Sequence, residues 1–273
     1  MKTELERARA QFEYEREHRG RILSAAKGDA RSRAFNEAYD GLYAGMASGD
    51  FLDQETEPQR KATQKLKLLR RFFRPDSRVA EFGPGNFHLA RAVAPMVASL
   101  TLIDVAEPDA SVQLPENCTF YKGDGISLPQ DLPRSGFDLI WSAHVVEHIH
   151  PEDVHEHLVN VRAALNDGGS YIIFTPNRFS GPHDISKRFS DVAQGLHLKE
   201  YTVSEMRNAL QKAGFKKIDA FAGGKGVYLH VPLWLPLLTE WKLHFLPTSI
   251  RRRIASLLPI KAILGIVIVG TKS

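Results

Sequence analysis

The pattern of hydrophobic and polar positions changes at about residue 76. Residues 1–75 contain many Glu, Arg and Ala residues and few strand formers, which favours helices. Farther along, short apolar runs alternate with segments of helical periodicity. The predicted strands are Arg78–Phe82, Leu100–Asp104, Cys118–Lys122, Phe137–Ser142, Ser170–Thr175, Lys217–Phe221 and Ile263–Gly270. Such alternation is typical of an α/β fold with a doubly wound, mostly parallel sheet.

The same pattern predicts two parts, an N-terminal helical extension at residues 1–75 and a sheet domain at residues 76–273. In the extension, Phe35, Tyr39 and Tyr43 are spaced four residues apart and therefore share one helical face. This face either packs onto the domain or covers a ligand pocket as a lid. The sequence leaves both interpretations open.

Composition and charge narrow the class of protein. The chain has 273 residues, a formal net charge of +4 and a single cysteine, Cys118. One cysteine suits a reducing compartment, and the charge is too small to indicate nucleic-acid binding. The charged N-terminus lacks the apolar core of a signal peptide, and no run of about 18 apolar residues could span a membrane. The sequence therefore predicts a cytoplasmic protein.

The stretch VAEFGPGNF, residues 79–87, places two glycines around a proline directly after the first predicted strand. Gly83 and Gly85 lack a Cβ atom, so the backbone can turn tightly and approach a ligand closely. Pro84 restricts the backbone between them. Because a helix is predicted over Leu89–Val97, the turn joins a strand to a helix. This arrangement binds polar and often anionic ligands.

Three acidic residues lie at the ends of the first three predicted strands: Glu81, Asp104 and Asp124. Ligands of such sheets bind outside the carboxyl ends of the strands. Asp104 lies about 20 residues beyond the turn, where a carboxylate can accept both hydroxyls of a ribose. Asp124 suits the exocyclic amine of an adenine, and Glu81 suits an ammonium or sulfonium group but would repel a pyrophosphate. The third position of the dinucleotide fingerprint is His88 instead of glycine, which disfavours a nicotinamide cofactor.

The ordered set of motifs resembles the class I S-adenosylmethionine-dependent methyltransferases. VAEFGPGNF is similar to their first motif, LTLID to their second-strand acid, and GDG to their adenine-side motif. FDLIWSAHVVEHIHPEDV is similar to the fourth-strand segment of the subgroup that includes ubiquinone-pathway enzymes. The resemblance covers about residues 63–221 and, more loosely, the final strand. It implies a Rossmann-like, seven-stranded sheet of order 3-2-1-4-5-7-6 whose last strand is antiparallel.

The resemblance also implies a set of residues that bind S-adenosylmethionine, with S-adenosylhomocysteine as the product. The methionine end would contact Glu81, Gly83 and Gly85, and the ribose would contact Asp104, with Val105 beside the adenine. The adenine amine and ring edge would face Asp124 and Gly125. The sulfonium group would be bordered by Ser142 and Ala143. Relatives that methylate exocyclic base amines often carry Asn-Pro-Pro after the fourth strand. The sequence Ala143-His144-Val145 stands there instead, which disfavours a nucleic-acid base as the acceptor.

A hydroxyl acceptor would need a general base, most often a histidine or a carboxylate. The candidates are His144, directly after the fourth predicted strand, and His183 and His197 in the long polar loop after the fifth. Long loops inside compact domains are usually functional, and this one lies over the acceptor side of the pocket. Asp184 and Arg188 are further candidates in this loop. In the alternative interpretation these two pair with each other at the surface and His197 caps the next helix.

Histidines are also dense between residues 144 and 157. His144 and His148 have the i,i+4 spacing of a helical metal site. The prediction is nevertheless that no metal binds, because His148 resembles a family feature that fixes the loop. His155 and His157 are expected on the solvated face of a helix.

The domain contains an apolar insert at about residues 226–260, with few charges that are mostly positive. In one interpretation it is a helical cap that buries its apolar side on the domain. In another it contacts a membrane surface or a lipid-linked acceptor, which its tryptophans and basic cluster favour. A contact between two copies of the chain is the third. Four prolines would break any long helix in this segment.

The predicted function is transfer of a methyl group from S-adenosylmethionine to a small-molecule, glycan or lipid-linked acceptor, at oxygen. Peripheral membrane contact through residues 227–260 is a further expectation, and a nucleic-acid partner is disfavoured. Two alternatives remain: a non-catalytic or regulatory protein that binds S-adenosylmethionine, and a nicotinamide-dependent oxidoreductase. The sequence identifies neither the acceptor nor the oligomeric state.

Overall fold

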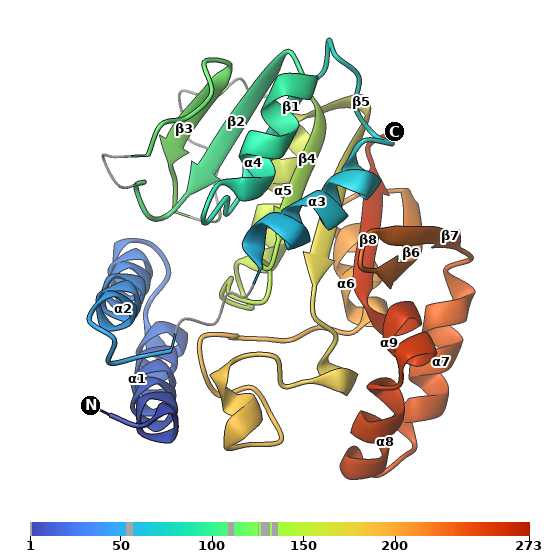
Figure 1. Cartoon of the computed structure of the whole chain (residues 1–273). Coiled ribbons are helices and arrows are strands. Elements are labelled where there is room, and N and C mark those ends of the chain that lie inside the picture. The colour runs from blue at the N-terminus through green and yellow to red at the C-terminus, as the bar shows by residue number, and fades with distance from the viewer. Residues whose placement is uncertain (1, 53–56, 109–111, 125, 127–131, 133–135) are drawn as a thin grey trace.

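The structure, a computed structural model, describes residues 2–52, 57–108, 112–124, 126, 132 and 136–273 (Figure 1). Within these residues, eight strands form one mixed sheet of order β3-β2-β1-β4-β5-β8-β6-β7. The strands are β1 Arg78–Phe82, β2 Ser99–Asp104, β3 Cys118–Lys122, β4 Phe137–Ala143, β5 Leu165–Thr175, β6 Lys217–Gly224, β7 Val227–Val231 and β8 Ile266–Thr271. This is the predicted α/β fold with a doubly wound sheet.

The sheet follows the expected order with one strand added at its edge. β1 to β5 pair in parallel, and β8 runs antiparallel between β5 and β6. The added strand β7 forms a hairpin with β6, although its sequence reads as part of the apolar insert. Lys225 and Gly226 both have positive φ angles, as a tight two-residue hairpin loop requires. The final strand begins at Ile266 instead of Ile263, because Leu258–Leu264 forms a helix.

Helices cover both faces of the sheet (Figure 1). Those described are α1 Glu4–Ser24, α2 Asp29–Ala47, α3 Pro58–Leu69, α4 His88–Val93, α5 Val154–Ala164, α6 Val203–Lys212, α7 Trp234–His244, α8 Thr248–Ala255 and α9 Leu258–Leu264. Helices α3 and α4 share a buried cluster with Val79 of β1, whereas α5 and α6 share another with Ala80 and Phe82. Because side chains alternate along a strand, Glu81 points toward the α3 and α4 side.

Helices α1 and α2 pack as a pair against the long loop that follows β5 (Figure 1). Their contact is a buried apolar cluster of Ile22, Ala38, Leu42, Leu196 and Leu198. The first three side chains come from the two helices and the last two from the loop. The N-terminal region thus supports the loop that the sequence places over the acceptor side of the pocket.

A buried ion pair connects α2 with the segment before α5. Nη1 of Arg31 donates to Oδ2 of Asp153 at 2.6 Å, and the two side chains are 5% and 0% exposed. Nη2 of the same guanidinium donates to Oε2 of Glu152 at 2.8 Å. These bonds fix α2 against the sheet domain independently of the apolar cluster.

The insert forms β7 and three short helices, α7 to α9, at one end of the molecule (Figure 1). Its inner side packs against Phe179 of the loop after β5, in a buried cluster with Leu243, Ala255 and Leu264. Glu240 is also buried, and its carboxylate accepts hydrogen bonds from the backbone amides of Val203 and Ser204 at the start of α6. Within the described part of the chain, no helix is both long and apolar enough to cross a membrane.

Candidate functional site

A cavity of about 600 Å³ lies at the carboxyl ends of β1, β2 and β4, which is where such sheets bind their ligands. Helices α2 and α3 and the loop after β5 form its other walls. Of the eleven residues predicted as catalytic or cofactor-binding, nine line this cavity. The two others are Ser142 and Gly125, and Gly125 lies outside the described residues.

The turn between β1 and α4 brings backbone to the cavity wall. Gly83 and Gly85 have φ angles of +67° and +51°, which L-residues with a side chain adopt rarely. A Cβ atom on Gly83 would lie 2.4 Å from Cγ2 of Val145, so no side chain fits there. At Gly85, the described residues leave the space within 4 Å of a Cβ atom empty. The first glycine therefore permits close packing, and the second leaves room for a ligand.

Glu81 is a buried carboxyl group beside this turn. Its side chain is 2% exposed, and Oε2 has no hydrogen-bond partner among the described residues. Burial raises the pKa of Glu81 to about 8, and the nearby charge of Lys65 on α3 offsets only part of that effect. A buried carboxyl group without a full set of partners is costly in the free protein. A cationic group of a ligand would satisfy it.

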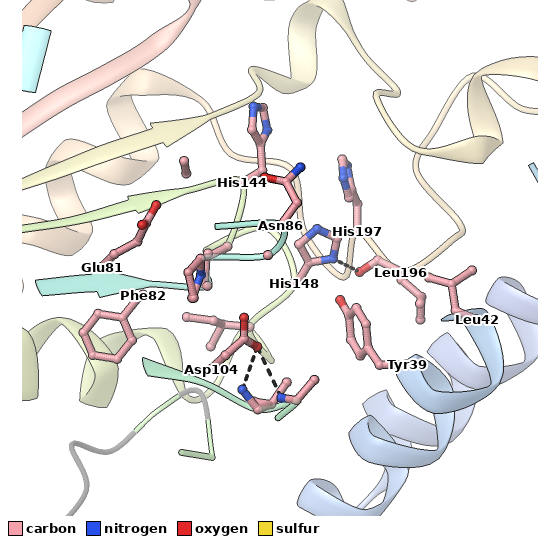
Figure 2. A pocket seen from close by; sticks show the side chains of 18 of the residues that line it. Tyr39, Leu42, Glu81, Phe82, Asn86, Asp104, His144, His148, Leu196 and His197 are labelled. Carbon is pink, nitrogen blue, oxygen red and sulfur yellow. Dashed lines mark hydrogen bonds between the residues drawn. The ribbon is translucent and has the colours of Figure 1, made fainter. Parts of the chain in front are cut away.

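Asp104 ends β2 and lines the cavity. Its Oδ1 accepts hydrogen bonds from the backbone amides of Val105, at 2.7 Å, and Ala106, at 3.3 Å, as Figure 2 shows. Burial raises the pKa of Asp104, and the hydrogen bonds from these amides offset part of that increase. A carboxylate has about four acceptor positions, so capacity for ribose hydroxyls remains. Val105 and Asp124 also line the cavity.

Ser142 is the predicted contact that the structure places elsewhere. It is fully buried, and its hydroxyl lies 2.7 Å from that of Tyr171. Ala143, the next residue of β4, lines the cavity instead. Since successive side chains of a strand point to opposite faces, only one of the two could border the ligand. Of the two residues expected beside the sulfonium group, only Ala143 therefore reaches the cavity.

His144 follows β4 in a left-handed backbone conformation with φ of +62°. Such strain in a residue other than glycine is uncommon and occurs often at functional sites. The side chain is 57% exposed and lines the cavity, and its Nδ1 lies 3.2 Å from Oε1 of Glu147. A carboxylate accepts, so Nδ1 carries the proton and Nε2 is available as an acceptor.

Glu147 is the central residue that the sequence analysis missed. It is fully buried, and its Oε2 accepts a hydrogen bond from Oγ1 of Thr175 at 2.8 Å. Burial alone would raise the pKa of Glu147, but the bond from His144 and the charges of the neighbouring histidines lower it to about 2. The available signal was an acid between two histidines in the stretch AHVVEHI.

His148 and His197 meet beside Glu147, with ring centroids 4.8 Å apart (Figure 2). Nδ1 of His148 donates to the carbonyl oxygen of Leu196 at 3.0 Å, and burial lowers the pKa of this histidine to about 4. Nδ1 of His197 lies 2.8 Å from Oε1 of Glu200. Burial opposes a charge on His197, but its carboxylate neighbours raise the pKa. The family resemblance of His148 as a loop-fixing residue agrees with its bond to Leu196.

His183 lines the cavity from the long loop, but its ring is already engaged. Nε2 lies 3.1 Å from the carbonyl oxygen of Asn177, to which it must donate. Asp184 is buried, and its Oδ2 accepts from the backbone amide of Gly195 at 2.9 Å. These bonds shape the loop, so His183 is less suited than His144 to accept a proton through Nε2.

The alternative interpretation of the loop is wrong in both of its parts. Arg188 pairs with Glu4 of α1 at 2.8 Å instead of with Asp184. Helix α6 is capped by Thr202, whose side chain accepts from the amide three residues on, and His197 takes no part in that cap. The loop therefore presents His197 to the cavity.

The histidines of α5 divide between the solvent and the core. His155 is exposed as predicted, whereas His157 is fully buried. Nε2 of His157 lies 3.0 Å from the hydroxyl of Tyr171, and its ring packs edge-on against Phe82 at 4.9 Å. His157 is three residues after Val154, which places it on the buried face of the helix. The expectation of a solvated His157 is thus wrong.

The aromatic face of α2 is turned toward the cavity. Phe35, Tyr39 and Tyr43 all line it, although they lie more than 100 residues before His148 in the sequence. The ring of Tyr39 packs edge-on against His148, with centroids 6.1 Å apart (Figure 2). These residues, together with Lys65 of α3, extend the site beyond the sheet domain.

Comparisons with known proteins agree with this geometry. A family model described as a methyltransferase domain matches residues 54–220, more than half of the chain. No curated protein sequence gives a match. Among solved structures, a SAM-dependent methyltransferase from Archaeoglobus fulgidus is 18% identical with a TM-score of 0.54, covering 86% of this chain and 100% of that one.

Two further structures are similar. A SAM-dependent methyltransferase from Thermotoga maritima, described as a possible histamine N-methyltransferase, is 15% identical with a TM-score of 0.54, covering 88% of this chain and 98% of that one. Phosphoethanolamine N-methyltransferase 1 of Haemonchus contortus, in complex with phosphoethanolamine and S-adenosylhomocysteine, is 15% identical with a TM-score of 0.50. That match covers 67% of this chain and 40% of the other. At such identities the structural likeness shows the fold.

Proposed function

Since the chain belongs to the family of S-adenosylmethionine-dependent methyltransferase domains, we propose that it methylates a hydroxyl oxygen of a small-molecule, glycan or lipid-linked acceptor. Methyl transfer from S-adenosylmethionine follows from the family, and the oxygen acceptor is the proposal. The observation that supports it is the pairing of His144, which lines the cavity, with the buried Glu147 behind it. A hydroxyl needs a general base, whereas a neutral amine can attack a methyl group without one.

The cavity residues fit S-adenosylmethionine as the methyl donor. The carboxyl group of Glu81, which lacks a partner at Oε2, suits the ammonium of the methionine end, and the space beside Gly85 admits it. Asp104 and Asp124 both line the cavity, and carboxylates there suit the ribose hydroxyls and the adenine amine, respectively. When bound, this donor supplies a methyl group on a positively charged sulfur. The volume of about 600 Å³ is within the usual range of small-molecule sites.

In the proposed step, the acceptor oxygen forms a bond to the methyl carbon while the carbon–sulfur bond breaks and its electron pair stays on sulfur. The hydroxyl proton passes to Nε2 of His144. The carboxylate of Glu147 stabilises the imidazolium through Nδ1. Because the ring of His144 is 57% exposed, it can return the proton to solvent. His197 is the second candidate base.

We also infer that residues 1–75 act as a lid over the acceptor half of the site, with the methyltransferase domain at residues 76–273. The support is the aromatic face of α2, whose Tyr39 contacts His148 inside the cavity. A lid of this kind excludes water from the reacting groups.

Replacing His144 with Asn tests the oxygen acceptor. Asn tolerates the left-handed backbone of this position but is not a base. We expect S-adenosylhomocysteine formation with hydroxyl acceptors to fall about 100-fold or more, because general bases contribute factors of that size. S-adenosylmethionine affinity should stay within threefold. The assay follows S-adenosylhomocysteine over a panel of sugars, phenols, lipid-linked glycans and amines.

The matched control is His155→Asn, which removes an exposed histidine of α5. Turnover of amines alone, unaffected by His144→Asn, would contradict the oxygen acceptor and would match the type of reaction named for the similar phosphoethanolamine N-methyltransferase. Binding of S-adenosylmethionine without turnover of any acceptor in the panel would favour a non-catalytic protein.

The outer surface of α7 supports peripheral contact with an anionic membrane, and we propose that the insert provides it. Trp234, Leu238, Trp241 and Phe245 repeat at helical spacing and are 41–68% exposed. The insert carries a single acid, Glu240, which is buried, so its exposed charges are positive. Interfacial aromatics beside basic residues suit a negatively charged lipid surface. An acceptor in or at the membrane would then lie near the site.

The double substitution Trp241→Ser and Phe245→Ser is expected to reduce binding to anionic vesicles at least tenfold, because it removes two exposed aromatic anchors. Co-sedimentation with phosphatidylglycerol vesicles measures it, and phosphatidylcholine vesicles should retain much less protein. Val159→Ser, on the exposed side of α5, is the control. The membrane proposal fails if the wild-type chain binds neither vesicle type, or if the outer surface of α7 forms a dimer contact instead.

A further inference from the structure

Glu147, His148 and His197 form a cluster of metal-ligand type. Each offers one ligand atom, and the three atoms lie within 4.8 Å of one another. The residues come from two segments, the turn after β4 and the end of the loop after β5, about 50 positions apart. Two imidazoles and one carboxylate form a frequent ligand set for catalytic zinc and for other divalent transition metals.

The surroundings of the cluster orient its members as they are oriented in metal sites. Nδ1 of His148 donates to the carbonyl of Leu196 at 3.0 Å, and Nδ1 of His197 bonds the carboxylate of Glu200 at 2.8 Å. Histidines that bind metals usually donate their second N–H to a carbonyl or a carboxylate in this way. Within the described residues, both rings make their hydrogen bonds through Nδ1, and Nε2 of each is left for a ligand. Each oxygen of Glu147 accepts one bond and keeps a further lone pair.

The cluster lies at the acceptor side of the cavity. His148 and His197 line the cavity together with His144, while Glu81 and Asp104 line the part assigned to the methyl donor. Figure 2 shows the rings of the three histidines on the same side, across from Glu81. A cation held there would have open coordination positions toward the cavity, because the protein supplies three ligands.

We propose that Glu147, His148 and His197 bind one divalent transition-metal ion, which coordinates the acceptor oxygen next to His144. Metal binding stands on the cluster itself, whereas the contact with the acceptor rests on the proposed oxygen methylation. A divalent ion lowers the pKa of a coordinated hydroxyl, and so its proton passes more easily to Nε2 of His144. The preference that follows is for acceptors with a second oxygen close to the methylated one, since both can coordinate. This revises the expectation that no metal binds.

Zn²⁺ titration of the chelator-treated chain by calorimetry, with S-adenosylhomocysteine binding measured in the same samples, tests the site. We expect one Zn²⁺ per chain with micromolar or tighter affinity, and a visible absorption band when Co²⁺ replaces it. His148→Asn, His197→Asn and Glu147→Gln should each weaken Zn²⁺ binding at least tenfold, with S-adenosylhomocysteine affinity within threefold. His155→Asn, which removes an exposed histidine, should leave both unchanged.

Absence of saturable Zn²⁺ and Co²⁺ binding by the wild-type chain overturns the site, whatever the variants do. Unchanged Zn²⁺ affinity in both His148→Asn and His197→Asn also overturns it. The two proposals fail separately. If Zn²⁺ binds as expected but hydroxyl acceptors are not methylated, the metal site stands and the proposed function does not; if hydroxyl turnover survives chelation undiminished, the metal has no part in it.

Discussion

Replacing Glu81 with Gln is expected to weaken S-adenosylmethionine binding about 100-fold and, at the same time, to stabilise the free protein. The carboxyl group is 2% exposed and lacks a hydrogen-bond partner at Oε2. It can therefore bind a cation, but in the free protein it lowers the free energy of unfolding. Losing a buried charge pair with the ligand ammonium costs about 3–5 kcal/mol, which is a factor of 100 or more in affinity.

The stability gain depends on pH in a defined direction. Burial raises the folded pKa of Glu81 to about 8, compared with 4.5 for the ordinary group. Between these values the folded state binds more protons than the unfolded state, so stability falls as the pH rises. Below pH 4.5 both states are protonated and the penalty vanishes. Gln has no such titration, so its advantage should grow from near zero at pH 4.5 to about 2–4 kcal/mol at pH 8.

Two measurements check this prediction. Calorimetric titration with S-adenosylmethionine, S-adenosylhomocysteine and NAD should show loss of both adenosyl ligands in Glu81→Gln and no NAD binding by either protein. Denaturant unfolding at several pH values gives the stability difference. Glu116→Gln, at an exposed position near β3, is the control and should change neither quantity. Equal affinity of wild type and Glu81→Gln would show that Glu81 does not hold the methionine end, and NAD binding would revive the oxidoreductase alternative.

Local sequence was sufficient to predict the sheet and the residues that line the cavity at the ends of β1 and β2. The strands are short apolar runs, and Gly83, Gly85 and Asp104 line the cavity at or directly after the ends of β1 and β2. The strand β7 was not predicted, because Val227–Val231 continues as an apolar run into α7. Only the turn at Lys225 and Gly226 separates β7 from β6. Such a hairpin is decided by a pair of φ angles more than by hydrophobicity.

The three candidate bases His144, His183 and His197 were predicted from the sequence and all line the cavity, but their partners come from distant segments. Glu147 becomes central only when the loop carrying His197 folds back onto it, and Tyr39 arrives from the N-terminal region. Ser142 was expected in the cavity although its strand turns it inward. Register and long-range packing, not residue type, decide all of these positions.

Replacing Arg31 with Met is expected to destabilise the chain by about 3–5 kcal/mol, the largest effect on stability that we predict. The substitution removes the guanidinium 2.6 Å from Asp153, whose carboxylate is fully buried. The nearest remaining cation is Lys27, with Nζ at 3.8 Å, and its side chain is 56% exposed. A buried carboxylate left with so weak a partner must lose either its charge or its position.

A double-mutant cycle separates the ion pair from the volume of the side chain. Arg31→Met with Asp153→Asn should recover more than half of the lost stability, because no unpaired charge stays buried. Lys27→Met removes an exposed cation that pairs with Asp153 and Glu156, and it should change stability far less than Arg31→Met. Urea unfolding of the four proteins gives the coupling energy. Additive effects of the two buried substitutions would contradict a coupled pair.

The same cycle tests whether the position of α2 matters to the site. Arg31 fixes the helix that carries Tyr39 and Leu42 into the cavity, so a loosened helix should expose the acceptor side while the donor contacts at Glu81 and Asp104 persist. In Arg31→Met we therefore expect the acceptor KM to rise several-fold at temperatures where the protein remains folded, with S-adenosylmethionine affinity within threefold. Recovery of KM in the double variant would link the ion pair to the lid. If KM is unchanged in Arg31→Met while stability drops, α2 supports the fold without closing the site.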